Sequence, residues 1–292
     1  MAHFQREKSK GTLVLVGIGL SILLTGCPPS PQISRPSAPS PPSMVAYHVL
    51  EKLHQQEQAI TTLSGLFRAE LRGFVGAFAP HIEGVVFYHR PQRMRLRGFT
   101  RIGGTLFDAV LSPVQYLIFL PQEGKVYTGS LGSWGEHAAG FEVPLRLSIR
   151  AMEILLGNIA TPAERLLDFK EEAEHYRFDY ADVHKSGTSS SLTHRVWVDR
   201  RYLRVSRVEY FSPSGDPMLV VTADHFRRVQ DAASVEQATI MLPFSVEAID
   251  PLQNGAVSLT FVELTVNTPL DQAVFHVKTP WGGGAPHDRE SR

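Results

Sequence analysis

The sequence has only one cysteine, Cys27, among its 292 residues. A single thiol excludes an intramolecular disulfide, so the fold must be stabilised by burial of apolar side chains. After residue 24, no apolar run approaches the ~20 residues that a membrane-spanning helix requires. The 29 basic and 29 acidic residues cancel, and we therefore expect no nucleic-acid partner.

Sequence signatures of enzymes are also missing. The chain contains no His-Glu-x-x-His pair, no cysteine cluster with metal-ligand spacing, no Gly-x-Ser-x-Gly elbow, no Walker loop and no dinucleotide fingerprint. We therefore predict no catalytic residues, no metal site, no cofactor and a non-enzymatic function. A hydrolase built from scattered histidines and aspartates is the remaining enzymatic alternative.

The N-terminal segment has the order of features found in a secretory signal peptide. Basic residues precede an apolar run from Leu13 to Leu24, and small residues follow it. Leu24-Thr25-Gly26-Cys27 also resembles the lipobox of bacterial lipoproteins, which implies cleavage before Cys27 and acylation of that residue. The alternative is a transmembrane anchor, but the run of about twelve apolar residues is short for one.

Composition divides the rest of the chain into three parts. Residues 27–43 combine the lipidated Cys27 with a linker of mostly proline and serine, which favours an extended stalk. Residues 44–281 form the folded domain, and residues 282–292 are expected to be a disordered tail. Pro28 after the cysteine favours placement in the outer membrane, facing the periplasm, and retention in the inner membrane stays an alternative.

Hydrophobic periodicity predicts an α+β domain. The spacing of apolar residues predicts a helix over 44–63 and a second over 145–157 that ends at Gly157, and Thr161-Pro162-Ala163-Glu164 matches the capping box of a further short helix. Strands are predicted over 66–72, 82–89, 93–99, 105–111, 114–120, 125–128, 176–181, 192–198, 202–211, 218–229, 240–249 and 256–266. Strands joined in long meandering runs favour one curved antiparallel sheet closed over by helices.

Three local segments, in this order, resemble the LolA/LolB family of lipoprotein carriers and receptors. They are the helix end and first strand over 59–67, the pair Pro91–Arg97 and Ile102–Phe107, and the helix over 145–157 with its Leu-Leu-Gly end. The resemblance implies a curved antiparallel half-barrel of about 11 strands, with helices packed as a lid over an apolar cavity for acyl chains. Because LolB is itself a lipoprotein, the lipobox places this remote homologue closer to LolB.

Candidate lipid contacts follow from apolar strand faces and apolar loops. The strand faces offer Phe67, Ala69, Leu71, Met94, Leu96, Tyr176 and Phe178 as lipid-binding residues. The same alternation fits a filled core equally well. The loop residues Phe74 and Phe78 are predicted to contact membrane or ligand, or else to fold back on the core. The resemblance places Ile102 at the position of LolB's protruding apolar residue.

Arg93, Arg95 and Arg97 form a basic stripe along one strand, which we interpret as a solvated face. Contact with lipid head groups or an acidic partner is the alternative for this stripe.

These observations lead to one functional hypothesis and one alternative. The chain is expected to be an outer-membrane lipoprotein that binds the acyl chains of a lipid or lipoprotein and assists their transfer or insertion into the membrane. Its partners would be the membrane, the acyl chains and a periplasmic carrier. The alternative is a structural or assembly lipoprotein whose sheet is a protein-docking surface.

Overall fold

The computed structural model describes residues 43–74, 81–91, 93–100, 102–130, 142–157, 164–182, 191–235 and 238–278. The chain divides into two units, residues 1–38 and 39–292, and all of the described residues belong to the second. The signal peptide, Cys27, Phe78 and the C-terminal tail therefore lie outside the described residues. Within the described part, no helix is long and apolar enough to cross a membrane.

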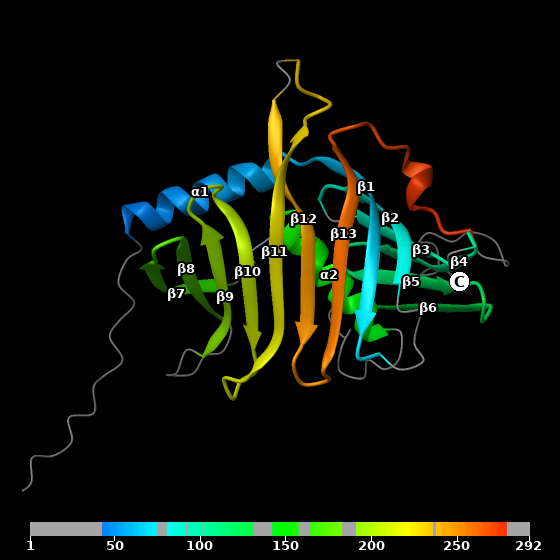
Figure 1. Ribbon diagram of the computed structural model, residues 1–292, viewed down its shortest axis with the longest axis horizontal. Coiled ribbons are helices and arrows are strands. Elements are labelled where there is room, and N and C mark those ends of the chain that lie inside the picture. Colours follow the sequence, from blue (N-terminus) through cyan, green and yellow to red (C-terminus); the bar gives the residue numbers. More distant parts are fainter. Residues whose placement is uncertain are drawn as a thin grey trace, which may run out of the picture. The chain divides into compact units, whose positions relative to one another are not determined.

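The described chain forms two α-helices, thirteen strands and one short 3-10 helix (Figure 1). In chain order they are α1 (Met44–Gln58), β1 (Thr62–Arg72), β2 (His81–His89), β3 (Arg93–Phe99), β4 (Thr105–Leu111), β5 (Gln115–Leu120), β6 (Lys125–Ser130), α2 (Glu142–Leu155), β7 (Glu164–Glu171), β8 (His175–Asp182), β9 (Leu192–Asp199), β10 (Arg204–Phe211), β11 (Pro217–Gln230), β12 (Thr239–Asp250), β13 (Gly255–Val266) and η2 (Gln272–Phe275). The predicted α+β class is confirmed, with thirteen strands in place of about eleven.

All thirteen strands belong to one open antiparallel sheet. The order across it is β6-β5-β4-β3-β2-β1-β13-β12-β11-β10-β9-β8-β7. The first six strands run outward from the middle to one edge, and the last seven return from the other edge until β13 pairs with β1. The chain therefore crosses from one edge to the other between β6 and β7, and α2 lies in this crossing.

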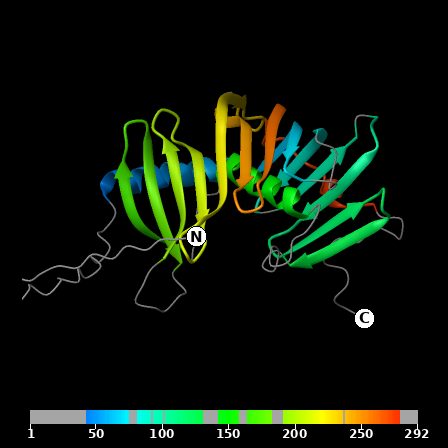
Figure 2. The same cartoon turned by 60° about the horizontal axis from the view of Figure 1, so that its bottom comes forward.

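Helix α2 packs against one face of the sheet, which we call the inner face. Its contacts are with β10, β11, β12 and β13, and Figure 2 shows it in the hollow of the curved sheet. Apolar side chains are buried around most of its circumference, as expected for a helix enclosed by the core: Val143, Leu145, Leu147, Ile149, Ala151, Met152, Ile154 and Leu155. Gly157 ends the helical region at a φ of 79°, a conformation that glycine adopts without strain.

Helix α1 begins with an N-cap in which the Ser43 hydroxyl accepts a hydrogen bond from the amide of Ala46 at 3.1 Å. Its buried residues are Ala46, Val49 and Leu53. The predicted helix over 44–63 is too long, because the chain enters β1 at Thr62. Ile60 is buried as predicted, but it lies in the connection and not on the helix.

The predicted short helix after Thr161 is wrong, since Glu164–Glu171 is the edge strand β7 paired with β8. The prediction rests on the capping-box match alone, and a β-bulge between Leu166 and Asp168 leaves the strand that follows without a plain alternation. The bulge places Leu166 and Phe169, three residues apart, opposite Tyr180 and Phe178 on the inner face. An apolar spacing of three is typical of a helix, so the bulge conceals the period of two expected of a strand.

The interpretation of the arginine stripe as a solvated face is wrong for Arg95. This side chain is only 9% exposed, and its Nε donates to Oδ1 of Asp108 at 2.7 Å while Nη2 donates to Oδ2. Its Nη1 donates to the carbonyl of Val274, in the segment after β13. That segment covers the outer face of β3–β5 and buries Phe275 and Val277 there. Packing by a distant segment, which strand periodicity does not report, removes Arg95 from solvent.

Candidate functional site

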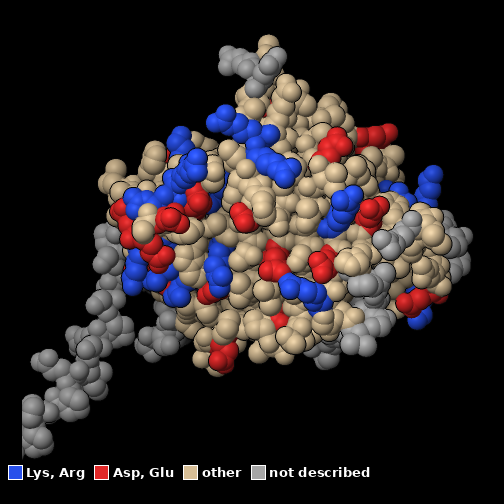
Figure 3. All heavy atoms as spheres, viewed as in Figure 1, with Lys and Arg blue, Asp and Glu red and all other residues tan. Residues whose placement is uncertain are grey.

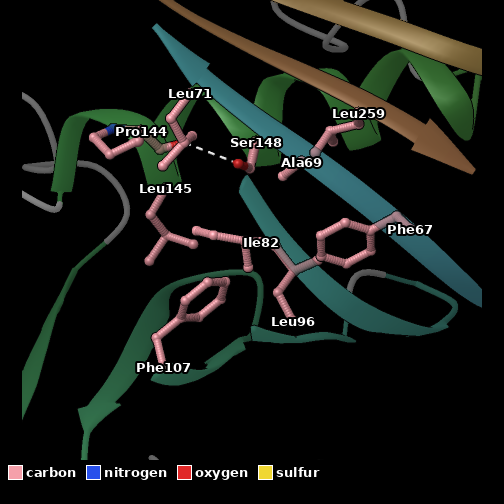
Figure 4. A pocket seen from close by; sticks show the side chains of 10 residues that line it. All are labelled: Phe67, Ala69, Leu71, Ile82, Leu96, Phe107, Pro144, Leu145, Ser148 and Leu259. Atoms are coloured by element: carbon pink, nitrogen blue, oxygen red, sulfur yellow. Dashed lines mark hydrogen bonds between the residues drawn. The ribbon is translucent and has the colours of Figure 1, made fainter. Parts of the chain in front are cut away.

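A small apolar cavity lies between the inner face of β1–β4 and the first turns of α2 (Figure 4). Ten side chains from six elements line it: Phe67, Ala69, Leu71, Ile82, Leu96, Phe107, Pro144, Leu145, Ser148 and Leu259. The volume open to the centre of a water molecule is about 20 Å³, which is room for about one water. The whole space between the lining atoms, including the part open to solvent, is about 390 Å³.

Two aromatic rings in the cavity wall rest directly on glycine backbone. A Cβ atom on Gly84 would lie 2.4 Å from Cζ of Phe67, and one on Gly98 would lie 2.3 Å from Cε1 of Phe107. Such distances are far inside van der Waals contact, so a side chain at either position would force its neighbours to shift. The two glycines provide the depth in the sheet that these rings occupy, and the rings limit the volume of the cavity.

The described residues of the cavity wall offer no ionisable group to a ligand. Nine of its lining residues are apolar, and the Ser148 hydroxyl donates to the Pro144 carbonyl one helical turn earlier at 2.9 Å. A site of this kind favours methylene chains through burial of apolar surface and has no means of orienting a polar substrate. Among the described residues there is also no cluster that could hold a metal ion.

The helical wall of the cavity is attached to the sheet by an ion pair. Nη2 of Arg146, in the first turns of α2, lies 3.3 Å from Oδ2 of Asp250 at the end of β12. Oδ1 of the same carboxylate accepts the amides of Leu252 and Gln253, each at 3.0 Å, and thereby fixes the turn into β13. Asp250 is only 4% exposed, so the carboxylate is a fixed anchor for this end of the helix.

The structure brings four of the seven predicted lipid-binding residues together. Phe67, Ala69, Leu71 and Leu96 line the cavity. Met94 is buried on β3 but does not line it, and Tyr176 and Phe178 lie on β8 in the other half of the sheet. The role of all seven in lipid binding stays a prediction.

Six lining residues were not among the predicted sites. Ile82, Phe107 and Leu259 show the alternation that singled out Phe67, so the same signal could have found them. The α2 residues Pro144, Leu145 and Ser148 could not be found in this way, because their place depends on the sheet order.

A row of rings in contact with one another occupies the inner face of β7–β10. Phe169 and Phe178 lie with ring centroids 5.0 Å apart, Tyr180 and His194 at 4.6 Å, and His194 and Tyr210 at 5.7 Å. Phe178 has no exposed surface. These rings therefore make a filled interior in this half of the sheet, in contrast to the cavity beside β1–β4.

The outer face of the same strands is charged. Figure 3 shows basic and acidic side chains interleaved over β7–β10. Oδ1 of Asp179 accepts a hydrogen bond from Nε of Arg195 at 2.7 Å and lies 3.3 Å from Nε of Arg177. Because the charges alternate in sign, this face carries a pattern of ion pairs and no field of one sign.

The predicted membrane-contact residues differ in exposure. Ile102 lies in the turn between β3 and β4, and 96% of its side chain is exposed. Phe74 follows β1 and is half-buried, with its ring over the backbone of Gly255. Strands β1 and β3 are both antiparallel to β2, so their C-terminal ends, and hence Phe74 and Ile102, lie at the same end of the sheet.

Comparison with known proteins gave matches among solved structures alone: no protein-family model and no curated protein matched the chain. A domain from Vibrio parahaemolyticus, described as an outer membrane lipoprotein-sorting protein domain, aligns with a TM-score of 0.51 and 10% identity over 78% of this chain and 94% of its own. A DUF1329 family protein from Desulfovibrio piger aligns with a TM-score of 0.53 and 10% identity over 81% and 98%.

A LolA superfamily protein from Nitrosomonas europaea also matches, with a TM-score of 0.49 and 12% identity over 76% of this chain and 96% of its own. At these identities the likeness concerns the fold. The open antiparallel sheet with α2 on its inner face therefore has the α+β fold of the lipoprotein-sorting domain, in agreement with the fold class that the sequence predicted.

Proposed function

We propose that this protein is an outer-membrane lipoprotein that binds acyl chains of a lipid or lipoprotein between α2 and strands β1–β4. The observation that carries the proposal is the cavity, whose described lining is apolar and contains no ionisable group. The protein would assist transfer of the bound molecule to the membrane. No bond is made or broken in this function.

Binding of a whole acyl chain requires the cavity to widen. Ligand sites for small molecules measure about 300–1,000 Å³, whereas the closed cavity admits the centre of a water molecule over only about 20 Å³. Movement of the first turns of α2, or rotation of Phe67 and Phe107, would enlarge it. The ion pair between Arg146 and Asp250 opposes the first of these movements.

Release would rest on a balance between two apolar environments. Each buried methylene contributes about 0.8 kcal/mol whether it leaves water for the cavity or for a bilayer. The free energy of an acyl chain therefore changes little on exchange between the cavity and the bilayer. The direction of transfer is determined by the membrane, which is the larger acceptor. The predicted lipid on Cys27 and the exposed Ile102 would keep the domain close to that acceptor.

Docking of another protein on the sheet is the alternative function. The filled interior around Phe178 and the ion pairs over β7–β10 favour it, because both are features of a rigid scaffold. In that case the cavity near Phe67 would be a packing defect without a ligand.

Substitution of Ala69 by tryptophan separates the two functions. Ala69 lines the cavity and is 6% exposed, and Ala223 on β11 has the same exposure but lies outside the lining. In a ligand chamber the indole of Ala69→Trp takes the place of an acyl chain, so stability is largely kept and binding of a fluorescent fatty-acyl probe is lost. The matched control Ala223→Trp overpacks a filled core at a cost of about 1–3 kcal/mol.

Equal destabilisation by both substitutions, together with no probe binding to the unmodified chain, would favour the docking function. Mass spectrometry of an organic extract of the purified protein adds a test that needs no substitution. Co-purified lipid supports the chamber.

A further inference from the structure

Arg204, the first residue of β10, has a buried side chain without a counter-ion among the residues that the structure describes. Only 6% of it is exposed, and its Nε is buried without a hydrogen-bond partner. None of the residues that the structure describes forms an ion pair with its guanidinium. Arg95, the other buried arginine of the described chain, instead has both oxygens of Asp108 as acceptors. Arg204 is therefore an exception that needs a physical reason.

The carboxylate nearest in register does not neutralise this charge. Asp199 lies directly opposite Arg204 in the pairing of β9 with β10. Its Oδ1 instead accepts the amides of Arg201 and Tyr202, each at 2.8 Å, and closes the turn between the strands. The carboxylate beside Arg204 is therefore engaged in hydrogen bonds with backbone amides.

The guanidinium reaches the end of α2. Its Nη1 lies 3.9 Å from the position that a Cβ atom on Gly157 would occupy. The partial negative charge at a helix C-terminus favours a cation there but does not replace a full counter-charge. Removal of the guanidinium from water lowers the pKa of Arg204 to about 10, so the side chain remains charged at neutral pH.

We propose that Arg204 binds an oxyanion, the phosphate or carboxylate of a ligand's polar head. A guanidinium has a planar fork of N–H donors that matches the two oxygens of such a group. A buried unpaired cation destabilises the protein, and an anion that pairs with it recovers that free energy on binding.

The proposal rests on the proposed function, because the oxyanion is the polar head of the molecule whose acyl chain binds in the cavity between α2 and β1–β4. The cavity lies at the Pro144 end of α2 and Arg204 at the Gly157 end. The 14 residues of this helix span about 21 Å at 1.5 Å per residue. The ligand is then an anionic amphiphile with its head group beyond the C-terminus of α2, and the packed side chains between the two sites must move to admit its apolar chain.

The test compares probes that differ only in the head group. The full chain is placed in vesicles of neutral phosphatidylcholine and exposed to photoreactive tetradecyl phosphate or to the matching tetradecyl alcohol. Labelling of residues 43–278 is measured by mass spectrometry in the unmodified chain and in Arg204→Met, Arg204→Lys and Arg207→Met. Arg207 is the control, since it lies on the same strand but is 43% exposed and paired with Glu209.

We expect the phosphate probe to label the unmodified chain at least about tenfold more than the alcohol, the factor that one charge-assisted hydrogen bond supplies. Arg204→Met should remove this preference without lowering the melting temperature, Arg204→Lys should keep part of it, and Arg207→Met should leave it intact. A separate arm measures the melting temperature in inorganic phosphate against chloride at equal ionic strength. A rise that Arg204→Met abolishes supports an oxyanion site whose source is the free ion.

Equal labelling by both probes, with no effect of inorganic phosphate, would overturn the oxyanion site and leave the acyl-chain function standing. Labelling by neither probe would remove the proposed function and the amphiphile with it. The head-group comparison on the unmodified chain decides the question even if Arg204→Met does not fold.

Discussion

The ring of Phe67 and the backbone of Gly84 lie in direct contact across the pairing of β1 with β2. A methyl group on Gly84 would lie 2.4 Å from Cζ of the ring and 2.6 Å from the carbonyl oxygen of Arg97. Because one of these neighbours is backbone, we expect Gly84→Ala to cost about 1–3 kcal/mol of unfolding free energy, as overpacked sites do. Urea unfolding of the chain from Ser43 onward measures this.

The control for this prediction is Gly104→Ala. A methyl group there meets only the hydroxyl oxygen of Thr100, at 3.3 Å, and surface substitutions usually change stability by less than about 0.5 kcal/mol. Equal stability of the two variants would mean that the Phe67 ring is free to leave its position, and the limit on cavity volume would need another cause.

Asp250→Asn should loosen the helical wall of the cavity. The amide oxygen can still accept the hydrogen bonds of Leu252 and Gln253, but the charge that holds Arg146 is lost. We expect a loss of roughly 1.5 kcal/mol in stability, the lower value for a hydrogen bond to a charged group, together with faster uptake of a fatty-acyl probe. Stopped-flow fluorescence measures the uptake.

Glu153→Gln on the same helix is the matched variant for Asp250→Asn. It removes an ion pair with Arg150 that lies within α2, and it should leave the uptake rate unchanged. If both variants changed uptake equally, the ion pair at Asp250 would have no special part in access to the cavity.

Ile102→Glu is expected to leave the fold intact and to weaken membrane contact. With 96% of the side chain exposed, the change in unfolding free energy should stay within about 0.5 kcal/mol. Binding of the unlipidated chain to liposomes should fall, because a charge replaces an apolar group at the interface. Unchanged liposome binding would show that this hairpin does not meet the membrane.

Cys27→Ala tests the lipid anchor. The lipobox-like sequence predicts that this variant keeps its signal peptide, takes up no labelled fatty acid and remains in the inner membrane. Metabolic labelling and membrane fractionation measure the two effects. Normal cleavage of the variant would contradict the lipoprotein assignment.

The sequence predicted the strands well, since alternation is a direct record of which face is buried. The strands over 93–99 and 105–111 have the predicted bounds. It failed at Glu164–Glu171, where a bulge changes the period, and at Arg95, which a segment about 180 residues away covers. The bulge disguises the alternation of its strand, and the covering of Arg95 leaves no local trace in the pattern.

The site was predictable in part for the same reason. Phe67, Ala69 and Leu71 alternate on one strand, and all three line the cavity. Pro144 and Leu145 reach it because α2 crosses from one edge of the sheet to the other, a matter of topology. Tyr176 shows the same alternation as Phe67 but lies in the filled half, because periodicity reports burial and does not distinguish a core from a chamber.

The pairing of β1 with β13 has a consequence for the order in which the protein folds. Leu63 lies opposite Val266, and the pairing joins the two halves of the sheet at its centre. Until residues near 266 are available, β1 has no partner on that side and its backbone groups are unpaired. Contacts of such long sequence separation form slowly, and a lone strand edge invites aggregation. We therefore expect chaperones to bind this chain until its last strand arrives.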